Sequence, residues 1–299
     1  MLGQELSWPG WRGDTRLDKR RLEEGFFKVL MVAATLVVVG SLLALFVAVL
    51  LKGAPALSLS MITQTPQGGY YLGKGGGILN AILGSLCLGA GATVLALVLA
   101  LPVALFLQKD YIGRSRFATV TRLSLDVLWG VPSIVYGAFG FIIMVYLGLR
   151  ASLLGGIIAL TLLELPIMVR AMDEVVRRVP QELKDESYAI GATRLETTMR
   201  VVLRQILPGA VTAILLAFGR GIGDAASILF TTGYTDSLPH SLLDPVASLP
   251  LAVFFQIGTP FPEVQQRAYA SAVILLVIVL LLSIISRLLV RKFTKYVIR

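Results

Sequence analysis

Residues 75–108 read GGGILNAILGSLCLGAGATVLALVLALPVALFLQ, without a single charged side chain between Lys74 and Lys109. A helix of about 20 mostly apolar residues crosses the roughly 30 Å hydrocarbon core of a bilayer. The stretch is long enough for such a helix, and it lacks the polar–apolar alternation of a membrane barrel strand. It therefore predicts a membrane-spanning helix from Ile78 to Leu107.

The rest of the chain is also rich in long apolar stretches with few charges. The 299 residues are 56% hydrophobic and 15% charged, with a mean hydropathy of +0.80, whereas a soluble domain carries about 25% charged residues. Further spans are predicted at Val29–Leu51, Val127–Leu149, Ser152–Val169, Ile206–Phe230 and Ala268–Ser286. The composition disfavours an ordinary soluble enzyme and predicts an all-α polytopic membrane protein with six transmembrane helices.

The basic residues fall mostly on one side of this predicted topology. Of the 27 Lys and Arg residues, four lie on the other side: Lys52, Lys74, Arg150 and Arg267. Arg220 lies inside a span, and the rest lie in the N-terminal tail, in the connections after spans two and four, and at the C-terminal end from Arg287 onward. Because basic loops stay in the cytoplasm, both termini are expected there. The predicted divisions are a tail (1–28), a first helix with its outer loop (29–77), a transmembrane core (78–290) and a second tail (291–299).

The longest predicted cytoplasmic connection contains a compact segment, residues 180–204. Pro180 suits a helix start, Gly191 interrupts the pattern, and helices are predicted at Glu182–Ile190 and Thr193–Leu203. The segment would be a solvated linker or a projection that fits a partner. Residues 188–190 (Tyr-Ala-Ile) form an apolar tip among charges, which favours a partner's groove.

Two charges lie inside the fifth predicted span, in the sequence GRGIGD (residues 219–224). Arg220 is 12 residues after Pro208, which places it roughly 18 Å along a helix, near mid-membrane. Asp224, four residues later, is expected on the same helical face. The pair would either hold helices together or lie on an anion's path, where the guanidinium binds an oxyanion and the carboxylate accepts the O–H of monohydrogen phosphate.

The remaining candidates indicate no catalytic centre. Glu164 and Arg170 are charges near the fourth span; Glu164 has no assigned role, and Arg170 is most simply a residue of the cytoplasmic end. Cys87 and His240 stand alone, so we predict no disulfide framework, no metal site and no catalytic residue. Lys74 follows glycines, but the phosphate-binding pattern GxxxxGK followed by Ser or Thr is absent, which predicts no ATP hydrolysis by this chain.

The compact segment resembles the EAA loop of ATP-binding-cassette (ABC) importer permeases, which runs E-A-A, three residues, G, then nine residues to I-x-L-P. The residues that stand at this loop are Asp185, Glu186, Ser187, Tyr188, Ala189, Ile190 and Gly191. Gly191 matches, Asp185 replaces the Glu, and Arg204 stands where Pro is usual. The resemblance implies that these residues contact an ATPase.

Three more stretches are similar to the PstA-type permease subunits of phosphate importers. They read DVLWGVPSIVYG (126–137), GIGDAASILFT (221–231) and DPVASLP (244–250), and with the loop they cover the chain from Gly75 onward. Asp224 stands at the family's Glu and Ser227 at its Pro. In that family, arginines at positions matching Arg220 and Arg170 are implicated in phosphate passage, so the resemblance gives a substrate pathway of Arg220, Asp224 and Arg170.

The resemblance implies a type I ABC importer permease fold with a cytoplasmic coupling helix, in the bacterial inner membrane. Its implied partners are a PstC-type permease, two ATPase subunits that hold ATP and Mg, an extracytoplasmic phosphate-binding protein and the lipid bilayer, without nucleic acid and without a cofactor on this chain. Two alternatives stay open at this point. They are a permease for another oxyanion, molybdate or tungstate, and a secondary transporter that works without ATP.

Overall fold

The computed structural model describes residues 15–68 and 75–293, and the regular structure within these ranges is helical apart from one isolated bridge between Pro66 and Gly76. The elements are α1 (Thr15–Gly53), η1 (Ala54–Ala56), α2 (Leu59–Thr63), α3 (Leu79–Phe106), α4 (Arg116–Trp129), α5 (Ser133–Tyr146), α6 (Leu153–Arg177), α7 (Gln181–Ala189), α8 (Arg194–Thr197), η3 (Thr198–Val202), α9 (Leu203–Gly221), α10 (Leu249–Ile257) and α11 (Pro262–Phe293). Within the described ranges, five helices are long and apolar enough to cross a membrane, and the α4–α5 pair makes up to six.

The chain divides into two units, Met1–Leu51 and Lys52–Arg299. In the first, α1 contains the predicted span Val29–Leu51, as expected from the absence of charge between Lys28 and Lys52. Parts of the predicted terminal tails (residues 1–14 and 294–299) and Lys74 lie outside the described residues.

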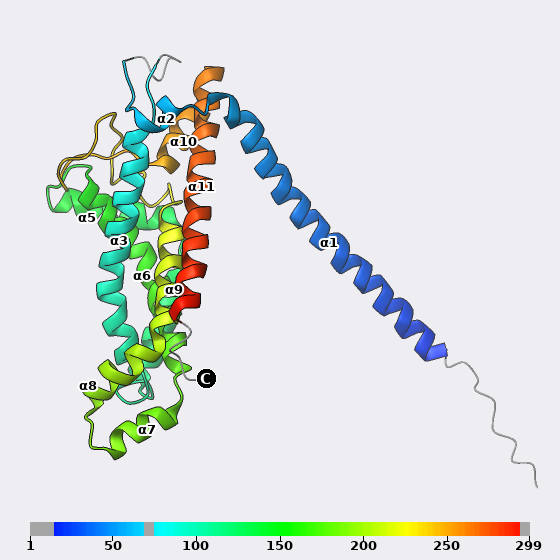
Figure 1. Ribbon diagram of the computed structural model, residues 1–299, viewed down its shortest axis with the longest axis vertical. Helices are drawn as coiled ribbons and strands as arrows, with labels where there is room; N and C mark the ends of the chain where they lie inside the picture. Colours follow the sequence, from blue (N-terminus) through cyan, green and yellow to red (C-terminus); the bar gives the residue numbers. More distant parts are fainter. Residues whose placement is uncertain (1–14, 69–74, 294–299) are drawn as a thin grey trace, which may run out of the picture. The chain divides into compact units, whose positions relative to one another are not determined.

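In the second unit, α3, α6, α9 and α11 run side by side (Figure 1). The α3–α6 contact depends on small residues at every fourth position of α3. Ala96, Ala100 and Ala104 are fully buried and pack against Met168 and Met172 of α6. Residues four apart share a helical face, and small side chains let two backbones approach closely within a membrane. The sequence pattern therefore lets α3 and α6 pack closely against each other.

The third predicted span, Val127–Leu149, is wrong as a single helix. The chain forms α4 and α5, which meet at an angle of 102°. Pro132 stands directly before the first residue of α5; proline has no N–H for a helical bond and pushes the preceding residue, Val131, out of the α region. Counting apolar residues missed this bend because hydropathy takes no account of the backbone.

The two ends of the second unit differ in construction. At the end that carries α7, short helices join α6 to α9. At the end that carries α10, an irregular connection (residues 222–248) covers the start of α6, where the N–H groups of Ser152 and Leu153 donate to the carbonyl oxygens of Thr231 (2.9 Å) and Asp244 (2.8 Å). These contacts fix the connection that follows α9 against the helical body.

Candidate functional site

The first helix and the glycine turn of the segment between α6 and α9 form as the sequence predicts. The second predicted helix, Thr193–Leu203, is instead divided into α8, the π-helix η3 and the first residue of α9. α7 follows Pro180 and ends at Ala189, and Gly191 adopts φ +89°, a left-handed conformation that favours glycine. Thr193 then caps α8, because its hydroxyl accepts from the N–H of Glu196 while the Glu196 carboxylate accepts from the N–H of Thr193. These hydrogen bonds to the carboxylate lower the pKa of Glu196 below its ordinary value.

α7 is fixed to the rest of the chain by a polar side chain that sequence reasoning missed. The Lys184 ammonium is buried and donates to Asp110 (Nζ–Oδ2 2.6 Å) and Gln108 (Nζ–Oε1 3.3 Å) in the connection after α3. The Gln108 amide in turn donates to the Thr198 hydroxyl (3.0 Å) in η3. A charged group that leaves water needs such partners. The contacts tie α7 to the end of α3 and to the start of α9.

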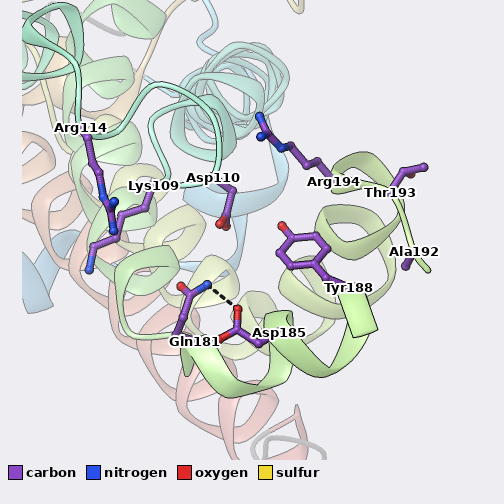
Figure 2. A pocket seen from close by; sticks show the side chains of 9 residues that line it. All are labelled: Lys109, Asp110, Arg114, Gln181, Asp185, Tyr188, Ala192, Thr193 and Arg194. Carbon is purple, nitrogen blue, oxygen red and sulfur yellow. Dashed lines mark hydrogen bonds between the residues drawn. The ribbon is translucent and has the colours of Figure 1, made fainter. Parts of the chain in front are cut away.

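This segment exposes three apolar side chains, and it also lines a hollow whose walls are mostly polar. Ile190 is 87% exposed, Leu195 61% and Met199 49%; the first belongs to the predicted tip, and the other two were not singled out from the sequence. Tyr188 is half-buried and lines a hollow of about 700 Å³ together with Asp110, Asp185 and Arg194 (Figure 2). Burial, and after it the Asp110 carboxylate, raises the pKa of the Tyr188 hydroxyl.

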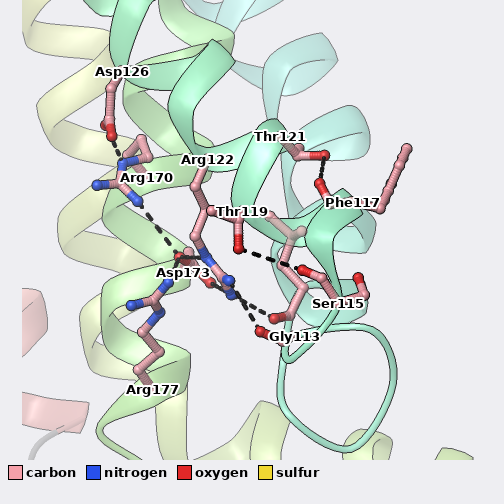
Figure 3. Close-up of polar contacts among 11 residues, drawn as sticks. Gly113, Ser115, Phe117, Thr119, Thr121, Arg122, Asp126, Arg170, Asp173 and Arg177 are labelled. Atoms are coloured by element: carbon pink, nitrogen blue, oxygen red, sulfur yellow. Dashed lines mark hydrogen bonds and ion pairs between the residues drawn. The ribbon is translucent and has the colours of Figure 1, made fainter.

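A network of ion pairs lies nearby, centred on Asp173 of α6 (Figure 3). The Asp173 carboxylate is buried and receives Arg122 of α4 through two hydrogen bonds, from Nε (2.9 Å) and Nη2 (3.1 Å). Arg177 approaches it to 3.2 Å and Arg170 to 3.7 Å. The spacing of Arg170, Asp173 and Arg177 is readable in the sequence as neighbours on a helix, whereas no local signal pairs Asp173 with Arg122.

Arg170, a predicted pathway residue, is neutralised by carboxylates. Its Nε lies 2.7 Å from Oδ1 of Asp126 on α4, in addition to the contact with Asp173. The Arg122 guanidinium also donates to the Leu107 carbonyl oxygen (2.6 Å) at the end of α3. The network therefore joins α3, α4 and α6.

Arg220 and Asp224 do not share a helical face, so this prediction is wrong. α9 ends at Gly221, and Asp224 lies in the turns that follow, where its Oδ1 accepts from the Ser227 N–H (2.9 Å). The glycines that surround Arg220 end the helix because glycine loses more conformational freedom in a helix than other residues. The predicted fifth span, Ile206–Phe230, accordingly stops at Gly221.

The position of Arg220 along the helical bundle follows from the contacts of the next residue, Gly221. Gly221 packs against Glu164 and Leu160, near the midpoint of α6 (Leu153–Arg177). Glu164 is fully buried; its Oε2 accepts from the Thr93 hydroxyl of α3 (2.9 Å), and its Oε1 contacts Gly221. Glu164 therefore links α3, α6 and α9, which accounts for a residue whose role the sequence left open.

The Arg220 side chain lines a cavity of about 780 Å³. The cavity lies among α4, α6, α9 and α11, and its polar lining residues are Thr212, Arg220, Ser283, Ser286 and Arg287. Arg220 forms no ion pair with any residue that the structure describes. An unpaired guanidinium beside such a cavity can take up an anion.

The fold is that of type I ABC importer permeases. A chain in the crystal structure of a bacterial alginate ABC transporter superposes with a TM-score of 0.62 at 12% identity, covering 95% of this chain and all of that one. A chain of the MetNI methionine ABC transporter gives a TM-score of 0.60 at 19% identity, over 72% of this chain and 95% of that one. The family model described as "Binding-protein-dependent transport system inner membrane component" matches residues 100–295. The chain belongs to this family.

Curated relatives narrow the family. The phosphate transport system permease protein PstA of Yersinia pestis is 35% identical over 242 residues, which cover 81% of each chain. PstA of Haemophilus influenzae is 33% identical over 238 residues, 79% of this chain and 83% of that one. The resemblance to PstA-type permeases is thereby confirmed. The relatives are permeases, so the chain is a multi-pass membrane component of a transporter rather than an enzyme, and its family implies ATPase and substrate-binding partners.

Proposed function

We propose that this chain is a permease subunit of an ATP-driven phosphate importer, in which it forms half of the translocation pathway. The observation that carries the proposal is Arg220 of α9. Its neighbour Gly221 packs near the midpoint of α6, and Arg220 itself lines a cavity and has no acidic partner in the described ranges. Arg220 is exposed on the helical body, and a charged side chain is costly to place inside a membrane, so it needs a compensating role. The names of the PstA relatives supply the substrate class, phosphate.

The proposed complex has a second, PstC-type permease, two ATPase subunits and an extracytoplasmic phosphate-binding protein. The proposed ATPase contact is the α7 segment, residues 180–204. A partner's groove would bury its exposed apolar side chains, Ile190, Leu195 and Met199. ATP and Mg bind to the ATPase subunits in this proposal. Both termini and α7 then lie in the cytoplasm, and α10 lies on the outer side of the inner membrane.

Coupling in the proposed cycle is mechanical. Closure of the ATPases on ATP moves α7, and Lys184 transmits the movement through Asp110 to the end of α3. The Gln108–Thr198 contact carries it to the start of α9, which bears Arg220 at its other end. Helices that tilt as packed bodies would expose the pathway to one side of the membrane at a time.

Asp224 and Arg170 have different roles in the proposed pathway. Asp224 accepts one hydrogen bond through Oδ1, and its other oxygen remains available for the O–H of monohydrogen phosphate, a group that sulfate lacks at neutral pH. Arg170 is paired with Asp126 and Asp173. We therefore expect Arg170 to influence passage mainly through the ion-pair network, and Arg220 to bind phosphate directly.

The test is ATP-dependent uptake of radiolabelled phosphate by the complex reconstituted in proteoliposomes. Arg220→Gln should lower uptake at least about tenfold, because losing charge-assisted hydrogen bonds costs more than about 1.4 kcal/mol. Arg178→Gln is the matched control: Arg178 is exposed, with 76% of its side chain accessible, and pairs only with Glu174 among the ion pairs of the described chain. Normal uptake by Arg220→Gln at equal assembly would overturn the assignment.

The competing oxyanion assignment is decided in the same vesicles. Molybdate and tungstate carry no proton at neutral pH, so a permease for them has no need of the Asp224 carboxylate. Phosphate uptake that falls in Asp224→Asn and resists excess molybdate supports phosphate as substrate. Molybdate uptake that Asp224→Asn leaves unchanged would refute it, and uptake without ATP would instead indicate a secondary transporter.

A further inference from the structure

The cavity that Arg220 lines has a second arginine. α9 and α11 run side by side with opposite chain direction (Figure 1). Arg287 of α11 lies on the cavity together with Thr212 of α9 and Ser286 of α11. The same three residues line a further cavity of about 510 Å³, which continues along α11 to Arg291. The two cavities therefore meet at Arg287, on the α7 side of Arg220.

The separation of the two arginines follows from helix geometry. Thr212 shares both cavities with Arg287 and precedes Arg220 by eight residues on α9. Eight residues rise about 12 Å along an α-helix. The backbones at Arg220 and Arg287 are therefore about 12 Å apart along the bundle, which places the two arginines at different levels of the same cavity.

The two cavity arginines differ electrostatically from their neighbours. Arg122, Arg170 and Arg177 are each paired with a carboxylate of α4 or α6. Arg220 and Arg287 make no ion pair with any residue in the described part of the chain. The positive charge on the cavity wall is therefore left for a ligand to neutralise.

The groups beside Arg287 complement a protonated oxyanion. The guanidinium offers paired N–H donors to two oxygens of a tetrahedral anion. The Thr212 hydroxyl donates to the Pro208 carbonyl oxygen (3.0 Å), so its own oxygen presents lone pairs to the cavity. That oxygen accepts an O–H, which phosphate carries at neutral pH and sulfate does not. The Ser286 hydroxyl can either donate or accept a hydrogen bond.

We propose that Arg287, Thr212 and Ser286 form a second phosphate-binding station, about 12 Å from Arg220 toward the α7 end. It rests on the proposed function, since it takes phosphate released from Arg220 and passes it on toward Arg291. Two stations on one path let an ion leave the first without leaving the pathway, so neither has to bind weakly by itself.

The first test compares Arg287→Gln, Arg287→Lys and the control Arg178→Gln in the reconstituted complex. Arg287→Gln should lower phosphate uptake about tenfold, and Arg287→Lys about threefold, because lysine keeps the charge but loses the bidentate fork. Arg178→Gln should transport as the wild type does. Full uptake by Arg287→Lys would overturn the proposal. An arginine that only anchors the end of the helix can be replaced by lysine, because it does not use two parallel N–H donors.

The second test measures occupancy at the station directly. Cys87 is the chain's single cysteine, so Cys87→Ser provides a cysteine-free subunit, and Ser283→Cys places a reporter on the cavity wall. Its modification by an anionic methanethiosulfonate, which the cavity arginines attract, should be slowed by inorganic phosphate, more weakly by sulfate, and no longer by phosphate once Arg287→Gln is added. A reporter that reacts in no nucleotide state means that a partner helix or lipid fills the cavity, which overturns the station.

The outcomes separate the two proposals. A wild-type complex that takes up no phosphate refutes the proposed function. Phosphate uptake that fails in Arg220→Gln but persists in Arg287→Gln leaves the proposed function intact and refutes the second station alone. Phosphate protection of the reporter that survives Arg220→Gln supports a station that binds independently of Arg220.

Discussion

Asp173 offers a quantitative test of what holds the α7 end of the bundle together. Its carboxylate is 1% exposed and takes two hydrogen bonds from Arg122, with Arg177 and Arg170 close by. Asp173→Asn preserves shape and removes the charge. The adjacent Glu174→Gln makes the same chemical change in the exposed Arg178–Glu174 pair, whose side chains are 76% and 60% accessible.

The expected magnitudes differ because burial differs. Removing one partner of a buried ion pair costs about 3–5 kcal/mol. We expect the lower end, about 3 kcal/mol, because Arg122 keeps its bonds to the Leu107 and Gly113 carbonyl oxygens, and Arg170 and Arg177 reach solvent. The exposed pair contributes about 0.5 kcal/mol or less. At roughly 2–4 °C per kcal/mol, Asp173→Asn should lower the melting temperature by roughly 6–12 °C, and Glu174→Gln by at most about 2 °C.

The assay is thermal loss of the monodisperse complex, followed by fluorescence-detected size-exclusion chromatography of both variants beside the wild type. The melting temperature of Arg122→Lys should lie between those of the two variants, because lysine keeps the charge but cannot reproduce the paired donors. If Asp173→Asn melts together with Glu174→Gln, the network contributes no more than a surface pair. The reasoning from burial would then be refuted.

Two further predictions concern coupling and packing. Lys184→Met should leave Asp110 without its 2.6 Å partner and loosen α7, so phosphate transported per ATP hydrolysed should fall several-fold; unchanged stoichiometry would exclude Lys184 from transmission. Gly221→Ala should force its methyl group against the buried Glu164 carboxylate and Leu160, costing about 1–3 kcal/mol by overpacking. A melting temperature that equals the wild type's would contradict this contact.

The sequence alone determined the features that depend on short stretches of chain. Charge-free runs such as residues 75–108 predicted spanning helices, because the bilayer core demands about 20 apolar residues wherever they occur. The first helix and the glycine turn of the α7 segment followed likewise from Pro180 and Gly191, whose backbone preferences act locally. The EAA-like loop and the phosphate-permease motifs gave the family, which the comparisons confirm.

Tertiary structure decided which charges meet. Arg122 and Asp173 are 51 residues apart, and Thr93 and Glu164 are 71 apart, and no periodicity reaches across such intervals. The structure also ended α9 at Gly221, which separates Asp224 from the helical face of Arg220, and bent the third span by 102° at Pro132. Hydropathy reports how favourably each segment enters lipid. Where a helix stops and which side chains it then faces depend on backbone geometry and on the packing of other helices, because a charge in a membrane is stabilised by its neighbours in space.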